Sequence, residues 1–196
     1  MSNKIKKILI TISMQIYNRD LAIKYATEWW NKRNPLFYDF ENLGGDCTNF
    51  ISQCLFYGGF SMHYQEWFFS SLNSRSPSWT GVNEFYNYLI TNKNQNFPQA
   101  KNVSIKDVEG GDLVQLSQSQ SNYHHTAIIT KIADSKDYEN IFITCHTLDA
   151  LNKPISAFYP VKIRFLKIIN WLFFFSYKKL ILKNIFLKLV NFFMRY

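Results

Sequence analysis

The part of the sequence with the clearest capacity for chemistry is a cysteine that follows a glycine pair. Gly44 and Gly45 predict a turn, and the residues after them have helical character, so we expect Cys47 in the first turn of a helix. Unpaired backbone N–H groups and the positive end of the helix dipole stabilise a thiolate there. Cys47 is therefore a candidate nucleophile. Taken alone, the pattern fits a small buried residue equally well.

A nucleophilic cysteine needs a histidine that acts as its base. The chain has four histidines. His63 lies in an aromatic segment and is interpreted as a surface residue. His124 and His125 begin a predicted strand, so their side chains point to opposite faces of the sheet. Because His125 leads directly into the apolar part of that strand, we predict that His125 is the base and that His124 lies on the rim.

Two residues are candidates for the group that orients the base. His146 ends the next predicted strand and Asp149 follows it closely. An antiparallel neighbour brings its end beside the start of the preceding strand, so we expect both residues near His125. Either one could fix the tautomer of the base. A buried structural histidine and a turn residue within 149–154 remain the competing interpretations.

A zinc site competes for the same side chains, because histidines from separate strands could bind zinc together with Cys47. No local pair of ligands and no CxxC motif accompanies them, so we predict no metal and no cofactor. The other two cysteines, Cys54 and Cys145, lie in apolar surroundings and are expected in the core. An odd number of cysteines without paired spacing argues against a disulfide framework. No Gly-x-Ser-x-Gly motif supports a serine nucleophile.

The elements that must position these residues are helices in the first half and strands in the second, which is typical of an α+β fold. Helices are predicted over residues 18–31, 47–57 and 81–91, and strands over 113–116, 125–132 and 141–146. Short polar loops join the three strands, which predicts an antiparallel meander. Residues 60–80 are interpreted as an ordered aromatic loop and residues 92–102 as a polar surface loop.

The composition indicates one globular domain with charged ends. The chain has 196 residues, of which 18% are aromatic, and a formal net charge of +8. Lysines gather in residues 1–7, and residues 162–195 carry lysines and arginines without any acid. Basic ends around a nearly neutral middle favour an anionic membrane or wall polymer as a partner, and nucleic acid is not predicted.

We therefore divide the chain into a basic and apolar leader (1–16), a central domain (17–164) and an apolar basic tail (165–196). The leader has too short an apolar stretch for a signal peptide and lacks a cleavage site, which favours a cytoplasmic or membrane-associated protein. In the tail, the polar residues form one narrow helical stripe. Residues 168–196 are accordingly predicted to lie on an anionic membrane surface, with burial in the core or a frayed extension as the alternatives.

Several short segments, found in a fixed order, resemble the putative amidase domain of Gram-positive bacteria. The match runs from about Tyr17 to Arg164. The Asp-Cys-Ser motif of the related NlpC/P60 and CHAP hydrolases is similar to residues 46–48. The segments that carry the resemblance are Asn34-Pro35, Tyr38-Asp39-Phe40, residues 42–53, Ser78-Trp79-Thr80-Gly81, residues 111–115, His125-Thr126, and His146-Thr147 with Asp149.

The resemblance implies a papain-like fold, in which the helix carrying Cys47 packs on an antiparallel sheet carrying His125. It also implies hydrolysis of an amide through a thioester, with a cell-wall peptide or another amide as substrate. The backbone N–H of Cys47 is expected to stabilise the oxyanion. The residues expected in the oxyanion and substrate cleft are Asp46, Tyr38, Asn42 and Trp79. A non-catalytic module that binds wall or membrane on the same scaffold is the alternative function.

Overall fold

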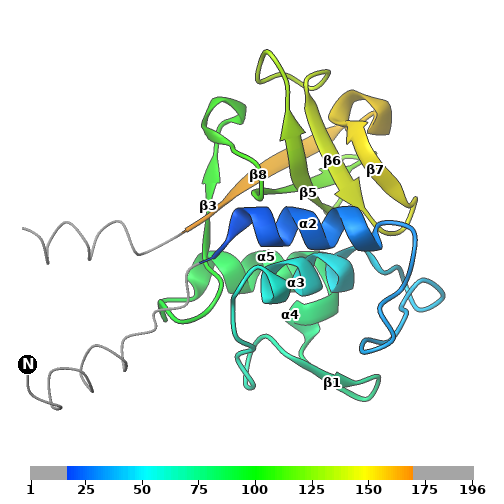
Figure 1. Ribbon diagram of the computed structural model, residues 1–196, viewed down its shortest axis with the longest axis vertical. Coiled ribbons are helices and arrows are strands. Elements are labelled where there is room, and N and C mark those ends of the chain that lie inside the picture. The colour runs from blue at the N-terminus through cyan, green and yellow to red at the C-terminus, as the bar shows by residue number, and fades with distance from the viewer. Residues whose placement is uncertain (1–16, 170–196) are drawn as a thin grey trace, which may run out of the picture. The chain divides into compact units, whose positions relative to one another are not determined.

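A computed structural model describes residues 17–169 as helices packed on an antiparallel sheet (Figure 1). In chain order the elements are α2 (Arg19–Trp29), α3 (Cys47–Tyr57), β1 (Phe69–Ser71), β2 (Ser74–Arg75), α4 (Pro77–Thr80), α5 (Val82–Thr91), β3 (Ala100–Val103), η1 (Ile105–Asp107), β4 (Leu113–Ser117), β5 (His125–Ile132), β6 (Ile141–Cys145), β7 (Ala150–Pro154), η2 (Ile155–Phe158) and β8 (Lys162–Ile168). Within these residues the helices come first and the six-stranded sheet follows, which confirms the predicted α+β class.

The strands of the sheet have the order β3-β8-β4-β5-β6-β7, and all neighbours are antiparallel. The centre of the sheet, β4-β5-β6, is the predicted meander. Leu116 lies opposite His125 in the first of its two ladders, and Ile128 lies opposite Thr144 in the second. This order places His125 at the start of an inner strand.

Two strands at the edges of the sheet are absent from the sequence prediction. The predicted turn over residues 149–154 is wrong for Ala150–Pro154, which pair with β6 as β7. The predicted loop over residues 92–102 likewise ends in β3, which pairs with β8. Both strands are mostly exposed or half-buried along their length. Their sequences therefore lack the apolar alternation by which a strand is recognised.

The strand β8 corrects the predicted domain boundary. It lies between β3 and β4, so a division at residue 164 falls inside an inner strand. Its apolar residues run on into the apolar tail in the sequence, which conceals the end of the strand. The predicted leader (1–16) and the tail from residue 170 onward lie outside the described residues. Between residues 17 and 169, no helix is long and apolar enough to cross a membrane.

Side chains are buried on both faces of the sheet. One face packs against α2, α3 and α5 (Figure 1), and its core includes Ile128 of β5 and Phe50 of α3. The opposite face forms a second core with η2, which includes Ala127 and Ile129 of β5. Since successive strand residues alternate between faces, Thr126 faces the helices while His125 shares the face of Ala127.

Polar contacts fix α2 to the sheet. The side chain of Asn18 accepts a hydrogen bond from the Leu21 N–H, which confirms the predicted helix start. The Arg19 guanidinium then contacts the fully buried carboxylate of Asp112 at 2.6 Å and the backbone oxygen of Ile168 at 2.9 Å. These bonds join α2 to the strands β4 and β8.

Candidate active site

The turn before α3 presents the candidate nucleophile. Gly44 and Gly45 have φ angles of 98° and 107°, which glycine adopts without strain. The N–H of Asp46 donates to the Thr147 hydroxyl at 2.7 Å, and α3 begins at Cys47. Within residues 17–169, no side chain caps the start of α3, and its first backbone bond runs from the Phe50 N–H to the Asp46 oxygen. The helix start therefore presents backbone donors beside the sulfur, as an oxyanion site requires.

The Cys47 thiol lies in a largely desolvated environment. It is 5% exposed, and its sulfur lies 3.8 Å from the Thr48 hydroxyl. Burial raises the pKa of Cys47, and the Asp46 charge raises it further. The Thr126 N–H, the Thr48 hydroxyl and the Thr48 N–H lower the pKa, but by less than burial raises it. The expected thiolate is therefore not the resting form, because desolvation outweighs the helix start. Cys47 rests as a neutral thiol near neutral pH.

The candidate base is equally buried. His125 is 4% exposed, and its ring stacks on Phe158 of η2 with 6.1 Å between the ring centroids. Burial, followed by the charge of His124, lowers the pKa of His125 to about 4. Its Nε2 is buried and has no hydrogen-bond partner among the described residues. The neighbouring His124 is exposed, in agreement with the predicted rim position.

The start of α3 touches the start of β5 through the residues that follow the two candidates. The Thr48 hydroxyl lies 3.1 Å from the Thr126 hydroxyl, and both side chains are fully buried. This contact brings together the chain segments that carry Cys47 and His125. Within residues 17–169, no hydrogen bond joins the Cys47 sulfur to His125, because the imidazole points to the face of Phe158.

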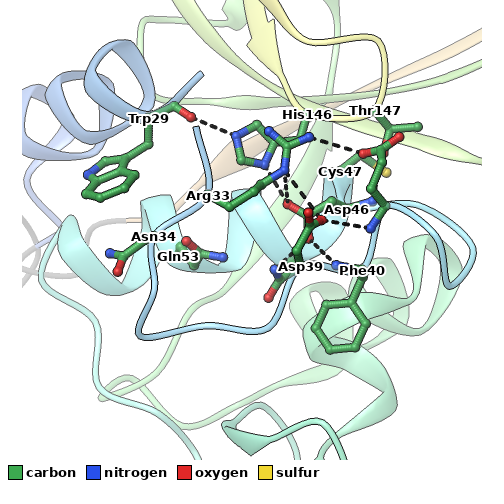
Figure 2. Close-up of polar contacts among 12 residues, drawn as sticks. Trp29, Arg33, Asn34, Asp39, Phe40, Asp46, Cys47, Gln53, His146 and Thr147 are labelled. Atoms are coloured by element: carbon green, nitrogen blue, oxygen red, sulfur yellow. Dashed lines mark hydrogen bonds and ion pairs between the residues drawn. The ribbon is translucent and has the colours of Figure 1, made fainter. Parts of the chain in front are cut away.

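The His146 ring lies on the helix face of the sheet. Its Nδ1 is 2.5 Å from Asp46 Oδ2, and its Nε2 is 2.8 Å from the Trp29 backbone oxygen (Figure 2). The ring stacks on Phe50 of α3 at 3.7 Å. Both ring nitrogens are occupied by these contacts, so neither is available to orient His125. The prediction that His146 orients the base therefore has no hydrogen bond to support it among residues 17–169.

Asp149 is held by Arg33, which also contacts Asp46 of the same network. Two guanidinium nitrogens contact its carboxylate at 3.0 and 3.2 Å. Arg33 also reaches Glu41 at 3.2 Å, Asp39 at 3.5 Å and Asp46 at 3.7 Å. Burial lowers the pKa of Arg33, but these carboxylates, led by Asp149, outweigh it and raise the pKa. Asp149 thus joins the loop of residues 34–46 to the turn after β6.

The four residues expected in the cleft divide into two pairs. Tyr38 is 40% exposed and Asn42 is exposed, so both can meet a ligand. Asp46 and Trp79 are fully buried, and the Trp79 indole N–H donates to Asn49 at 2.8 Å. These two residues support α3 from within, and their expected place in an open cleft is wrong.

A buried polar row that is not predicted from the sequence lies beside the site. The Gln115 amide donates to the Thr126 hydroxyl at 3.1 Å and to the Val82 carbonyl at 2.9 Å. Its oxygen accepts from Arg164 Nε at 2.8 Å. The row crosses three neighbouring strands and ends at Thr48, next to the nucleophile. A glutamine in the otherwise apolar stretch 113–116 was the available signal for it.

Arg33 is a second residue whose role is not predicted from the sequence, although four acids surround it.

The other two cysteines, Cys54 and Cys145, are free and buried, which confirms their predicted place in the core. Among residues 17–169, no group of three or more histidine, cysteine or acidic side chains is arranged to hold a metal ion.

The fold and the site define a class of α+β proteins in which a cysteine starts a helix and a histidine starts an adjoining strand of an antiparallel sheet. The chain belongs to the family described as the putative amidase domain, whose model matches residues 16–169. That description indicates a hydrolase that acts on amide bonds. The match covers all of the described residues, including both edge strands and β8.

Two curated proteins of Bacillus subtilis (strain 168) are similar to the chain. The uncharacterized protein YhbB is 31% identical over 141 residues, which are 68% of this chain and 42% of YhbB. The uncharacterized protein YjcM is 26% identical over 149 residues, which are 72% of this chain and 34% of YjcM. The chain thus spans less than half the length of these relatives. No solved structure matches it.

Proposed function

We propose that the chain is a cysteine-dependent amide hydrolase with a papain-like arrangement of its site. Cys47 is the nucleophile and His125 is the base. The observation that supports this most is the contact of Thr48 with Thr126, because it joins the cysteine-bearing helix start to the histidine-bearing strand start. The substrate we propose is a peptide or a related amide, including peptides of the cell wall.

The reaction begins from a neutral pair. His125 takes the thiol proton as the Cys47 sulfur attacks the amide carbon, and the carbonyl oxygen becomes an oxyanion. The intermediate collapses when His125 gives this proton to the leaving amine, which leaves a thioester. Water then attacks the thioester carbon while His125 takes a proton from the water. The carboxylic acid departs, and His125 gives this proton to the Cys47 sulfur, which restores the thiol. The first step requires the His125 ring to turn from Phe158 toward the sulfur.

The oxyanion is stabilised by the backbone N–H groups at the start of α3. The N–H of Cys47 is adjacent to the attacking sulfur, and the exposed Tyr38 supplies a second donor from the preceding loop. A single such donor typically contributes about 3 kcal/mol to the transition state. His146 and Asp149 act as positioning residues, since they hold the turn before Cys47 through Asp46 and Arg33.

The test compares three cysteine variants of the full chain. We expect Cys47→Ala to abolish hydrolysis of peptide amides while its thermal melting stays close to that of the wild type. The matched controls Cys54→Ala and Cys145→Ala remove equally buried thiols and should retain turnover. We also expect iodoacetamide to label Cys47 before the other two in the native protein. If all three cysteines are labelled equally, and only after denaturation, the proposal is refuted.

A non-catalytic binding module on this scaffold is the second candidate. It is favoured by the absence of a hydrogen bond between Cys47 and His125 among the described residues and by the burial of both. Under this function, Cys47→Ala would bind anionic vesicles or wall fragments as tightly as the wild type, and neither protein would release amine from any amide. Measured turnover that depends on Cys47 would exclude it.

A further inference from the structure

A pocket of about 430 Å³ lies on the helical side of the described residues, outside the candidate active site. It opens between the β1–β2 hairpin, α4 and the start of α5. Six residues line it, and two of them carry opposite charges: Arg75, Ser76, Pro77, Thr80, Gly81 and Glu84.

The guanidinium of Arg75 is held in place but is not neutralised. It stacks over the Phe40 ring at 4.6 Å, donates from Nε to the Thr80 hydroxyl at 3.4 Å, and donates from Nη1 to the Leu72 carbonyl. Among residues 17–169, no carboxylate lies within ion-pair distance of it. The Nη2 hydrogens remain available to a carboxylate, in a planar fork that suits two parallel bonds.

Glu84 supplies the opposite charge from the first turn of α5. Its carboxylate covers Gly81, so closely that a Cβ added at Gly81 would collide with it. The Glu84 carboxylate also forms no ion pair with the described residues. The pocket therefore holds one carboxylate and one guanidinium that are not paired with each other. Two unpaired opposite charges in one pocket suit a ligand that carries both.

Two sets of contacts connect residues at this pocket to α3 and to the turn before it. Phe40, under the Arg75 guanidinium, donates its N–H to Asp46 at 3.0 Å, and Asp46 precedes the nucleophile. The α4 residue before Thr80 packs along the first turns of α3, since the Ser52 hydroxyl donates to the Trp79 carbonyl at 2.9 Å (Figure 1). The pocket is thus joined to α3 through Phe40 and Trp79, although none of its lining residues belongs to that helix.

We propose that this pocket binds a dipolar, amino-acid-like group, with its carboxylate on Arg75 and its ammonium on Glu84. The binding itself follows from the two charges. Its use as a substrate subsite rests on the proposed function, in which such a group would be part of the amide substrate or of its product.

Binding is measured first on full-length Cys47→Ala, so that turnover plays no part. The probe is the dipeptide Ala-Ala, compared by calorimetry with its N-acetyl derivative, its carboxamide, and the derivative carrying both blocks. We expect saturable binding of the free dipeptide, about tenfold weaker binding of each singly blocked form, and none of the doubly blocked form. Equal binding of all four forms, or no binding of the free dipeptide, would overturn the proposal.

Charge variants locate the ligand in the pocket. Arg75→Gln should weaken binding of the free dipeptide about tenfold and leave binding of the carboxamide unchanged. Glu84→Gln should also weaken binding of the free dipeptide about tenfold, but leave binding of the N-acetyl form unchanged. Lys131→Gln is the matched control, since Lys131 also lies over a phenyl ring, that of Phe142, far from the pocket in the sheet. If Arg75→Gln fails to fold, Arg75→Lys and the dipeptide-induced NMR shift of the Gly81 amide in Cys47→Ala report the same contact. An unmoved Gly81 amide contradicts the proposal.

Kinetics on the protein with Cys47 intact separate the pocket from the chemistry. If the pocket is a subsite, Arg75→Gln should have a higher KM than the wild type for amides with a free carboxylate, and nearly the same kcat. Binding without any hydrolysis would retain the pocket and refute the proposed function. Hydrolysis with the same KM in Arg75→Gln and the wild type would refute the subsite and retain the function.

Discussion

At the scale of single residues, the site is a neutral pair kept from ionising by burial. A helix start alone lowers the pKa of a thiol, and its effect on an exposed charge is at most about 1 kcal/mol. Removing a thiolate from water costs more, so the pKa of Cys47 rises. The same desolvation lowers the pKa of His125 to about 4. The pair is therefore suited to transferring its proton during attack and not to storing a thiolate–imidazolium ion pair.

This protonation state predicts the pH dependence of catalysis. We expect kcat/KM to fall on the acid side with a midpoint near 4, where His125 takes up a proton, and to stay level from about pH 5.5 to 8. An ion-pair enzyme would instead lose activity as its imidazolium loses a proton near neutral pH. The measurement is the pH profile of kcat/KM with a peptide anilide, and an acid midpoint between 6 and 7 would contradict the buried neutral base.

At the scale of elements, a buried pair joins the start of α3 to the end of β6. Asp46 and His146 are each 1–2% exposed at their side chains and lie 2.5 Å apart. The other oxygen of Asp46 accepts from the Phe40 N–H at 3.0 Å and from Asn49 at 2.8 Å. Removing one partner leaves a buried polar group of the other without its hydrogen bond, which is the costly case.

A double-mutant cycle tests this connection. We expect Asp46→Asn and His146→Gln each to lower the free energy of unfolding by about 3 kcal/mol, and the double variant to lose less than the sum of the two. Urea unfolding of the four proteins measures it. Asp134→Asn, at an exposed position, is the matched control and should change stability little. Additive losses at Asp46 and His146 would show that the two side chains are not coupled.

The glycine pair before α3 offers a second test at this scale. Both glycines have positive φ, so alanine at either is strained by about 1–2 kcal/mol. A Cβ at Gly44 would meet open space, whereas one at Gly45 would lie 3.2 Å from the Thr147 hydroxyl, which holds the Asp46 N–H. We therefore expect both variants to lose stability but only Gly45→Ala to lose most of its activity. Stability by thermal melting and turnover on one substrate separate strain from displacement, and equal activities would contradict this role of Thr147.

At the scale of the whole molecule, the two cores on opposite faces of the sheet leave His125 in an apolar environment. The stability of the fold therefore depends on pH. Its pKa is 6.5 in the unfolded chain and about 4 in the folded one. Between these values the unfolded chain binds more protons. The stability of the fold therefore rises with pH across this window and is lost as the pH falls through it.

The expected size of this effect is about 3 kcal/mol between pH 6.5 and 4, from about 1.4 kcal/mol for each unit of the pKa shift. We expect His125→Asn to flatten the corresponding part of the curve of unfolding free energy against pH. His124→Asn removes an exposed histidine and should retain most of the slope. The measurement is urea unfolding at half-unit pH steps, and an unchanged slope in His125→Asn would contradict the burial of the neutral imidazole.

How far the sequence predicts the fold depends on local pattern. The helices over residues 19–29, 47–57 and 82–91 and the central meander follow from apolar periodicity and turn residues. The strands β3 and β7 do not, because an edge strand is stabilised by pairing with one neighbour and needs no apolar alternation of its own.

The sequence by itself determined the α+β class, the position of Cys47 at a helix start and the placement of His125 at a strand start. Each of these is decided within a few residues, by backbone preference and by the burial of one stripe. Only the tertiary structure decided that His146 pairs with Asp46, that Asp149 pairs with Arg33, and that the thiol and the base are both neutral. Those outcomes depend on which side chains from distant segments share one desolvated space, and residue spacing carries no information about that.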